Sequence, residues 1–424
     1  MKAHELKSLL QNGALKKYSV LYADVEAQAT RMIAALDRFT EIYGSTRDVY
    51  LFSVPGRSEI LGNHTDHNRG CVLAGAIDRD IISVAARNDD GRIRLYSEGY
   101  AESVVVLDRC HTPENFKPFT SVALMAGMAR GFTDRSYAVG GFDTYSTTEV
   151  LKGSGLSSSA AFEVMIGNIL NHLYNGGIIP NEEIAKIAQF SENVYFGKPC
   201  GLMDQMACAV GGFVFIDFKE ADAPVVTPIP FSLSEKQYAL CIVNTGGSHA
   251  NLNDDYAAVP HEMHAVAALL GHSVLRQTTE DALVQNAHRI REALGDRALL
   301  RALHFVRENE RVLTARDALL RSDLDSLLTL VRASGDSSFK YLQNVYTNQC
   351  VEQQGLSLAL ALTEGYLNGR GACRVHGGGF AGTIQAFVPY ELVDGLVSLL
   401  DGVFGEGATM RLSIRPLGAT LLFG

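Results

Sequence analysis

The chain has 424 residues, 47% of them hydrophobic, which is enough for two or three domains with sizeable cores. Lysine and arginine together number 37 and aspartate and glutamate 47, so the formal net charge is −10. An acidic chain without a long basic run has no electrostatic footprint for a nucleic-acid backbone. A DNA or RNA partner is therefore disfavoured.

The cysteines and the N-terminus indicate a reducing compartment. The seven cysteines are scattered, odd in number and never form a C-x-x-C pair, which predicts reduced thiols and not a disulfide framework or a zinc knuckle. Residues 1–13 mix Lys and Glu with Leu and lack the apolar stretch of a signal peptide. No segment approaches the roughly 18 uninterrupted apolar residues of a membrane span. We expect a cytoplasmic protein with no membrane partner.

The first third of the chain changes from helical to strand-like patterns. Two amphipathic stretches near 5–10 and 25–43 predict a helical extension that covers residues 1–44. Short runs rich in β-branched residues follow, separated by Gly, Asn and Asp turn signals, and they predict strands. These runs are 49–54, 71–77, 81–86, 92–96 and 103–107.

The remainder of the chain mixes helices with strands. Next in chain order we expect a helix at 120–132, a strand at 139–147, helices at about 156–173 and 181–195, and a strand at 212–218. Residues 220–230 hold three prolines and little periodicity, so we predict a domain crossover there, between an N-terminal domain (45–225) and a C-terminal domain (226–424). The second domain should contain a strand at 238–244, several helices between about 259 and 364, and strands at 372–376, 383–388 and 410–416. This pattern predicts a mixed α+β fold.

The most informative segment is Lys152-Gly153-Ser154-Gly155-Leu156-Ser157-Ser158-Ser159, at the start of a predicted helix. Glycines allow close approach to a ligand, and the first turn of a helix offers free N–H groups to an anion. The serine hydroxyls suit phosphate oxygens or a metal ion. A serine-capped helix without a ligand would give the same local pattern, so both interpretations stay open.

Two better-known nucleotide motifs are absent from the chain. Gly197-Lys198 is followed by Pro199, which excludes a Walker A loop there. Ser158 occupies the third glycine position of a dinucleotide fingerprint, which excludes that motif as well.

A second segment, residues 55–70, follows the first predicted strand and is dense in polar groups. Loops after strands commonly hold binding sites, and these side chains suit a polyol. The candidates are Arg57, Asn63, His64, Asp66 and Asn68. A metal site at His64, Asp66 and His67 is an alternative, and a solvated turn without a ligand is another.

Two further segments complete the candidate site. Glu192 lies on a predicted helix and Asp204 just past a Pro-Cys-Gly turn. Two carboxylates near a phosphate loop can divide the work of binding Mg²⁺ and engaging an attacking hydroxyl, although each alone is more often a cap or a surface charge. The glycine cluster Gly377-Gly378-Gly379 between two predicted strands is either a turn or a close approach to a nucleotide or sugar.

These four segments occur together and in the order found in the GHMP kinases, the superfamily of galactokinase, homoserine kinase and mevalonate kinase. Within it the chain resembles the galactokinase branch, because residues 56–68 are similar to the signature G-R-x-N-x-I-G-E-H-T-D-Y-N and residues 200–205 to C-G-x-M-D-Q. The resemblance covers roughly residues 45–424. It implies a domain like the second domain of ribosomal protein S5, joined to a ferredoxin-like C-terminal domain.

The resemblance also implies roles for individual residues, with ATP and Mg²⁺ as cofactors and a small sugar as substrate. Asp204 would orient or deprotonate the C1 hydroxyl of the sugar, and Arg57 would stabilise charge on the transferring phosphoryl group. Ser159 and Glu192 match the Mg²⁺-binding pair. The ATP phosphates would be cradled by Gly153, Ser154, Gly155, Leu156, Ser157 and Ser158. The sugar pocket would be lined by Asn63, His64, Asp66, Gly201 and Tyr256, with Gly377–Gly379 completing it.

The first signature is imperfectly matched. Asn63 stands where galactokinases have a Glu that is expected to bind the C6 hydroxyl, Ser58-Glu59 replaces an apolar-Asn pair, and His67 replaces Tyr. Because a neutral amide would not repel a C6 carboxylate, a galacturonate kinase is an alternative to a galactokinase. A kinase for another related sugar such as N-acetylgalactosamine is a further alternative. A non-catalytic sugar and ATP sensor and a metal hydrolase are alternatives from other classes. The sequence leaves the oligomeric state open between a monomer and a weak dimer.

Overall fold

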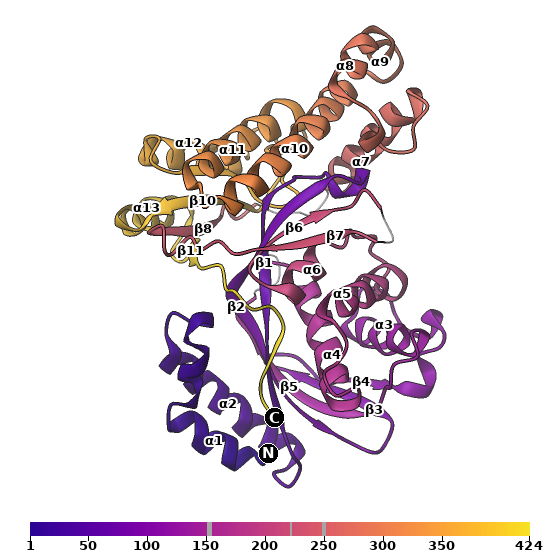
Figure 1. The fold of residues 1–424 in the computed structure, drawn as a ribbon, viewed down its shortest axis with the longest axis vertical. Helices are drawn as coiled ribbons and strands as arrows, with labels where there is room; N and C mark the ends of the chain where they lie inside the picture. The colour runs from indigo at the N-terminus through magenta and orange to yellow at the C-terminus, as the bar shows by residue number, and fades with distance from the viewer. Residues whose placement is uncertain (151–154, 221–222, 248–251) are drawn as a thin grey trace.

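Helices cover both faces of two β-sheets, and these sheets form the framework of the chain (Figure 1). The computed structural model describes residues 1–150, 155–220, 223–247 and 252–424, apart from the side chain of Asn253. The prediction of a mixed α+β fold is confirmed.

The larger sheet has eight strands, with the main order β12-β1-β2-β5-β3-β4, and β6 extends it beside β2 with β7 at its edge. Only β3 and β5 pair in parallel; the other described pairings are antiparallel. Its strands are β1 (Tyr50–Leu61), β2 (Cys71–Arg87), β3 (Arg92–Ser97), β4 (Ser103–Val106), β5 (Phe142–Thr148), β6 (Phe213–Asp217), β7 (Val225–Ile229) and β12 (Thr420–Phe423).

Both faces of this sheet are buried, and side-chain alternation along the strands decides which residue faces which layer. Ile82 and Val84 of β2 lie in the core with α1 (Ala3–Gln11) and α2 (Val25–Tyr43), whereas Ile81 and Ala85 lie in the core on the opposite face. That opposite layer consists of α3 (Ser121–Asp134), α4 (Ser158–Tyr174), α5 (Asn181–Phe190) and α6 (Met203–Val210). Figure 1 shows the two layers on either side of β2 and β5.

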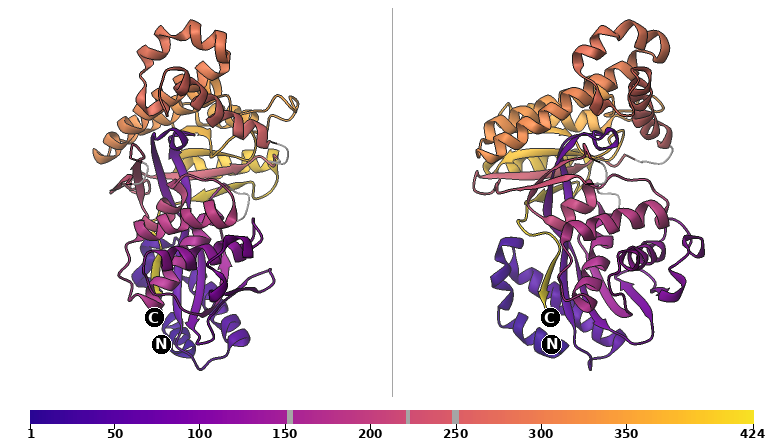
Figure 2. Two further views of the ribbon diagram at one scale, coloured as in Figure 1. Left: turned by 90° about the vertical axis from the view of Figure 1, so that its right-hand side faces the viewer. Right: turned by 45° about the vertical axis from the view of Figure 1, so that its right-hand side comes forward.

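The smaller sheet has the order β11-β8-β10-β9 and is antiparallel throughout. Its strands are β8 (Tyr238–Asn244), β9 (Ala372–Val375), β10 (Thr383–Pro389) and β11 (Thr409–Leu412). One face packs on α12 (Gly355–Leu367) and α13 (Tyr390–Phe404), and the other on α10 (Asp296–Leu320) and α11 (Leu324–Ser337). The helices α7 (Asn253–Leu269), α8 (Glu280–Gln285) and α9 (Ala287–Leu294) lie beyond this layer, at the end of the molecule farthest from the termini (Figure 2).

Short helical turns connect these elements. Five are 3-10 turns: η1 (Ala14–Leu21), η2 (Asp66–Asn68), η3 (Leu107–Arg109), η4 (Pro113–Asn115) and η6 (Leu275–Gln277). Two are π-helical: η5 (Ser191–Phe196) and η7 (Ser338–Leu342). The helix predicted at 181–195 therefore ends at Phe190 and continues as η5. None of the helices in the described ranges is long and apolar enough to cross a bilayer.

The strand predicted at 49–54 is longer than expected. It continues to Leu61, so Arg57, Ser58 and Glu59 lie in β1 and not in a loop. The pairing of β1 with β2 has register shifts at Pro55/Arg57 and Glu59/Leu61, and the first of these accommodates Pro55 and Gly56. The runs predicted at 71–77 and 81–86 are likewise one strand, β2, because β1 pairs along its whole length.

Two strands were not predicted. β7 lies in the proline-containing segment 220–230, where Pro228 is tolerated because β7 is an edge strand paired only with β6. β12 brings the end of the chain back to β1. Both termini consequently lie at the same end of the molecule (Figure 2). Both unpredicted strands pair within the larger sheet. The predicted boundary between the two domains at 225/226 stays a prediction.

A buried ionic network joins the N-terminal helices to the larger sheet. The carboxylate of Asp80, fully buried on β2, accepts hydrogen bonds from Arg31 of α2 at 2.7 Å, Tyr22 at 2.8 Å, Arg415 at 3.4 Å and Ser53. Burial alone would raise the pKa of Asp80, but the two arginine charges hold it below its ordinary value. The predicted extension of residues 1–44 is thus part of the folded body.

We expect Asp80→Asn to lower the free energy of unfolding by about 3–5 kcal/mol, because it leaves buried arginine charges without their carboxylate. Urea unfolding followed by far-UV circular dichroism measures the change. As a control, Glu41→Gln removes an exposed ion pair with Arg38 and should leave the midpoint unchanged. An Asp80→Asn protein as stable as the wild type would contradict a structural role for the network.

Candidate functional site

The described part of the glycine–serine segment packs directly against β1. The backbone N–H of Arg57 donates to the carbonyl of Leu156 at 3.1 Å. A Cβ atom at Gly56 would lie 2.6 Å from that carbonyl oxygen, so only glycine allows this approach. Gly155 has a φ of 73°, in the left-handed region that favours glycine. Gly153 and Ser154, which were predicted to bind phosphate, lie outside the described residues.

Arg57, Asp204 and Ser157 form a single hydrogen-bonded unit. Arg57 binds the Asp204 carboxylate with two parallel bonds, from Nε at 2.7 Å and from Nη2 at 2.9 Å, and its Nη1 donates to Gly155 O at 2.5 Å. Ser157 Oγ donates to Asp204 Oδ2 at 2.5 Å. The strand β1, the glycine–serine turn and the start of α6 therefore meet at one point.

The Asp204 side chain is the accessible end of this unit. It is 34% exposed, against 8% for the side chain of Arg57. Burial alone would raise the pKa of Asp204, but the charge and hydrogen bonds of Arg57 and the bond from Ser157 hold it below its ordinary value. The pKa of Arg57 is raised in turn, because the Asp204 charge outweighs the effect of burial. At neutral pH the site presents a carboxylate that is fixed in place and open to a hydroxyl.

Ser159 and Glu192 meet at the beginning of α4. Ser159 Oγ donates to Glu192 Oε1 at 3.2 Å, and Glu192 itself is 2% exposed. Glu192 lies on the π-helical turn η5, a geometry that is frequent at functional sites. Lys198 Nζ lies 3.5 Å from the same oxygen. These contacts bring together the two residues that were predicted to bind a metal ion.

Two residues without an assigned role, Gln205 and Glu163, hold the other oxygen of Glu192. Gln205 Nε2 donates to Glu192 Oε2 at 2.7 Å and to Glu163 Oε2 at 3.3 Å. Glu163 is fully buried, and burial together with the Glu192 charge raises its pKa well above the ordinary value. The signal in the sequence was Glu163, the one carboxylate in the largely apolar helix that begins at the serines.

The oxygen donors of Ser159 and Glu192 fit a magnesium site. Mg²⁺ usually takes one or two protein ligands and completes its shell with water and substrate phosphates. In the part of the chain that the structure describes, no three His, Cys, Asp or Glu residues are arranged to hold a metal ion. His64, Asp66 and His67 therefore do not form the metal site that was the alternative interpretation.

Three of the predicted sugar-binding residues contact the glycine-rich turn, Gly377–Gly379. Asn63 Nδ2 donates to Gly377 O at 2.6 Å, and Tyr256 OH to Gly379 O at 2.7 Å. Between them, His64 Nε2 lies 3.0 Å from Gly378 O. Three consecutive carbonyls of the turn are thus held by three side chains. Asn63 is fully buried, whereas His64 and Tyr256 remain partly accessible.

Asp66 and Gly201 connect this group to Asp204. A Cβ atom at Gly201 would lie 2.3 Å from Asp66 Oδ2, so the absent side chain makes room for the carboxylate. Gly201 lies just before α6, which carries Asp204 in its first turn. The described sugar-binding, catalytic and metal-binding candidates are therefore continuous with one another.

His376 is a further residue of the site whose position the sequence did not reveal. Its ring joins Ser58 Oγ at 3.1 Å to Thr383 Oγ1 at 3.0 Å, which bridges β1 of the larger sheet and β10 of the smaller sheet. A Cβ atom at Gly155 would lie 3.2 Å from its Nδ1. Burial and the nearby charges of Arg57 and Arg374 lower the pKa of His376 to about 3, so the ring is a neutral spacer behind the turn.

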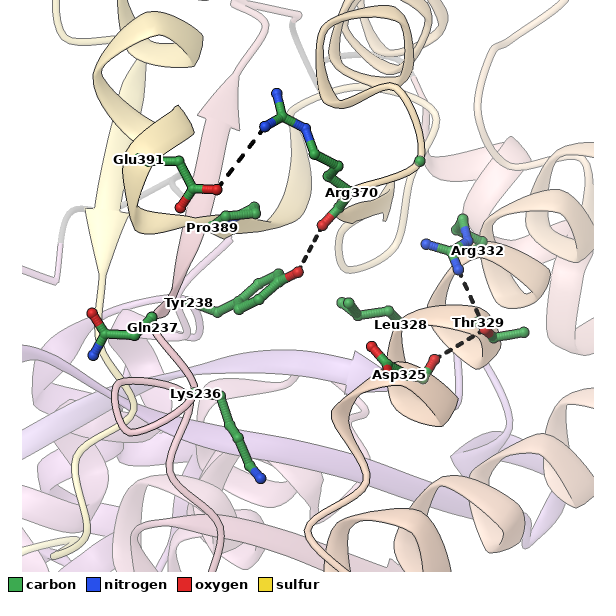
Figure 3. Close-up of a pocket in the computed structure, with 11 residues that line it drawn as sticks. Lys236, Gln237, Tyr238, Asp325, Leu328, Thr329, Arg332, Arg370, Pro389 and Glu391 are labelled. Carbon is green, nitrogen blue, oxygen red and sulfur yellow. Dashed lines mark hydrogen bonds and ion pairs between the residues drawn. The ribbon is translucent and has the colours of Figure 1, made fainter.

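A pocket of about 460 Å³ lies elsewhere, between β8, α11 and the start of α13 (Figure 3). Its polar groups include Lys236, Asp325 and Arg332, and Arg370 and Glu391 form an ion pair at 4.0 Å on its rim. None of the predicted site residues lines it. The contacts around Asp204, and not this pocket, mark the candidate site.

Family models match two parts of the chain, which contain Arg57, Asp204 and the glycine–serine segment. The model for the GHMP kinases N terminal domain matches residues 123–212, and the galactokinase galactose-binding signature matches residues 37–87. The chain is 32% identical to a galactokinase of Streptomyces coelicolor, over 87% of this chain and 92% of that protein. It is 30% identical to a galactokinase of Glaesserella parasuis, over 86% of this chain and 91% of that protein.

Solved structures share the fold. The galactokinase of Lactococcus lactis in complex with galactose has a TM-score of 0.76 and 24% identity, over 91% of this chain and 98% of that one. A mevalonate kinase has a TM-score of 0.60 and 16% identity, over 87% and 99%. The two-domain GHMP kinase fold that the sequence predicted is confirmed.

Glu163 should make stability depend on pH. Because its pKa is raised by folding, the folded protein keeps a proton that the unfolded chain releases above about pH 4.3, so stability falls as pH rises from there toward the folded-state pKa. Glu163→Gln cannot titrate at this position, and its stability relative to the wild type should increase as the pH rises from about 4.3 through the range in which the protein stays folded. Urea unfolding across this range measures the difference. A difference that stays constant with pH would show that Glu163 does not titrate abnormally.

Proposed function

The chain belongs to the galactokinase family of GHMP kinases, and from this premise we propose that it transfers the γ-phosphoryl group of ATP to the C1 hydroxyl of galactose. The observation that carries the proposal is the Arg57–Asp204–Ser157 unit, which places an ionised carboxylate beside the glycine–serine turn. Galactokinase relatives at about 30% identity over most of the chain favour galactose over galacturonate or N-acetylgalactosamine. A sensor without catalysis is not favoured, because the charged groups that phosphoryl transfer needs are in contact.

Phosphoryl transfer needs in-line positioning and charge stabilisation more than covalent participation of the protein. Asp204 has a lowered pKa and is therefore a weak base. It acts first as an acceptor that orients the C1 hydroxyl, and it takes the proton as the new bond to phosphorus makes that hydroxyl more acidic. Arg57 fixes Asp204 with two bonds and places a positive charge beside the phosphate turn.

The phosphate side of the site is formed by the turn and the start of α4. Gly155, Leu156, Ser157 and Ser158 would lie along the ATP phosphates, and Gly153 and Ser154 remain predicted members of this set. Ser159 and Glu192 would hold Mg²⁺, which when bound would neutralise charge on the β- and γ-phosphates. Gln205 keeps the Glu192 carboxylate in one orientation for this purpose.

The sugar side is formed by His64, Asp66, Gly201 and Tyr256. The Asp66 carboxylate can accept hydrogen bonds from two adjacent hydroxyls, and Gly201 leaves room beside it. Tyr256 packs edge-to-face on Phe380 at a ring distance of 5.3 Å, which fixes the face that the tyrosine presents. Asn63 is buried beneath this surface and contributes through the turn at Gly377.

A substrate screen tests the function. ADP release with Mg-ATP should be fastest with galactose among galactose, galacturonate, N-acetylgalactosamine, arabinose and glucose, because a site built to bind given hydroxyls rejects analogues that lack them. Phosphorus NMR of the product should show a sugar 1-phosphate. Turnover confined to a different sugar would overturn the substrate, and binding without turnover across all five would overturn the enzyme.

Asp204→Asn should lower kcat about 10²–10⁴-fold, because the amide can neither take the proton nor carry the negative charge that orients the hydroxyl. Steady-state kinetics with galactose and Mg-ATP measure the loss, and an unchanged unfolding midpoint shows that the variant is folded. Near-normal turnover in a folded variant would rule out Asp204 as the orienting group.

Glu192→Gln should raise the Mg²⁺ concentration needed for half-maximal activity by at least about tenfold, because the neutral amide is a poorer ligand for a hard cation. Calorimetry of Mg²⁺ binding in the presence of ADP gives a readout that does not depend on turnover. Glu183→Gln is the matched control, since Glu183 of α5 pairs with Arg135, which follows α3, and contacts neither serine. Equal Mg²⁺ affinities in both variants would count against Glu192 as a ligand.

A further inference from the structure

The side chain of Asn63 is buried and its hydrogen-bonding capacity is occupied by the protein. Its Nδ2 donates to Glu59 Oε1 at 3.0 Å and to Gly377 O at 2.6 Å. Its Oδ1 accepts from Asn344 Nδ2 at 2.7 Å. Both amide hydrogens and the amide oxygen are thus committed, which requires an amide at this position.

Glu59 carries the negative charge of this cluster. Its carboxylate lies 3.3 Å from Nη2 of Arg374, and the two side chains are 7% and 0% exposed. Burial raises the pKa of Glu59, although the Arg374 and Arg57 charges and the bond from Asn63 oppose the effect. Arg374 also donates to Ile60 O at 3.0 Å, so its guanidinium contacts two consecutive residues of β1.

The galactokinase signature has the same two residue types in the opposite positions. It carries Asn at the position of Glu59 and Glu at the position of Asn63. In this chain the two side chains are hydrogen-bonded to each other, so one carboxylate and one amide are still present in the same contact. A carboxylate at position 63 would have no hydrogen to donate to Gly377 O and would face the carboxylate of Glu59.

The cluster of Glu59, Asn63 and Arg374 contacts the glycine-rich turn at the carbonyl of Gly377. Asn63 holds Gly377 O, while His64 and Asn344 contact Gly378 O and Tyr256 holds Gly379 O. Asn63 therefore holds the same turn as His64 and Tyr256, the two residues of this set that are partly accessible.

We propose that Glu59 and Asn63 are an exchanged pair of positioning residues: the carboxylate and the amide of the galactokinase signature have traded places, and the two act as one unit that sets the glycine-rich turn over the sugar site. The kinetic test of this proposal rests on the proposed function. The pairing itself stands on the contacts of Glu59, Asn63 and Arg374.

A cycle of single and double variants tests the pair. Asn63→Glu places two carboxylates against Arg374, and Glu59→Asn leaves the buried Arg374 charge without its carboxylate, so each should lower the Tm and raise the KM for galactose about tenfold or more. The double variant Glu59→Asn with Asn63→Glu restores one carboxylate and one amide, and should recover most of both losses. The KM for ATP should change little in every member, because the turn at Gly155–Ser159 is not part of the cluster.

Control variants separate positioning from stability. Asn171→Asp alters a buried amide on α4 that binds the backbone of Ile179, outside the site, and should lower the Tm without changing the KM for galactose. Asn63→Ala removes the amide without adding charge. If Asn63→Glu fails to fold, Asn63→Ala should still raise the KM for galactose and leave that for ATP unchanged.

Additive effects in the double variant, in Tm and in KM, would overturn the exchanged pair. A KM for ATP that rises as much as the KM for galactose would overturn its positioning role. If the wild-type protein phosphorylates none of the tested sugars, the proposed function fails, and recovery of the Tm in the double variant still decides the pairing.

Discussion

The ion pair between Arg57 and Asp204 is the contact on which the arrangement of the site depends. Arg57 is fixed on a strand that is buried on both faces, and Asp204 begins a helix packed on that sheet. Their two parallel bonds leave little freedom of orientation, and Ser157 and Gly155 attach the phosphate turn to the same pair. The carboxylate is thereby ionised, immobile and partly exposed, which is the combination that an orienting group needs.

Contacts between the two sheets position the glycine-rich turn of the candidate site. Residues of β1 reach the smaller sheet through Ser58 with His376 and through Glu59 with Arg374. These groups are buried, and removing one partner of such a pair is costly, so the contacts favour a single relative placement of the sheets. The glycine-rich turn is attached to that interface. The proposed sugar site, which combines the loop after β1, the glycine-rich turn, the residues before α6 and Tyr256 of α7, thus has most of its geometry set before ligand arrives.

The sequence predicted the helices and strands with strong periodicity and the residue types of the site. The strand predicted at 238–244 has the observed bounds, because its apolar run lies between polar residues and is shorter than a typical helix. The segment 55–70 was predicted to follow the first strand, but its first residues lie in β1, since a register shift at Pro55/Arg57 accommodates them. β12 is only four residues long, and its pairing with β1 some 370 residues away leaves no local signal.

By itself the sequence determined the α+β pattern and the identities of the charged and glycine-rich segments, because these follow from local patterns, and its resemblance to galactokinase signatures indicated the family. Only the tertiary structure decided what each side chain contacts. Asn63 belongs to a buried cluster and not to the accessible surface, Glu163 and Gln205 support Glu192, and His376 is a neutral spacer. Burial and hydrogen-bond partners come from residues far apart in the chain, and the linear order of amino acids does not specify such distances.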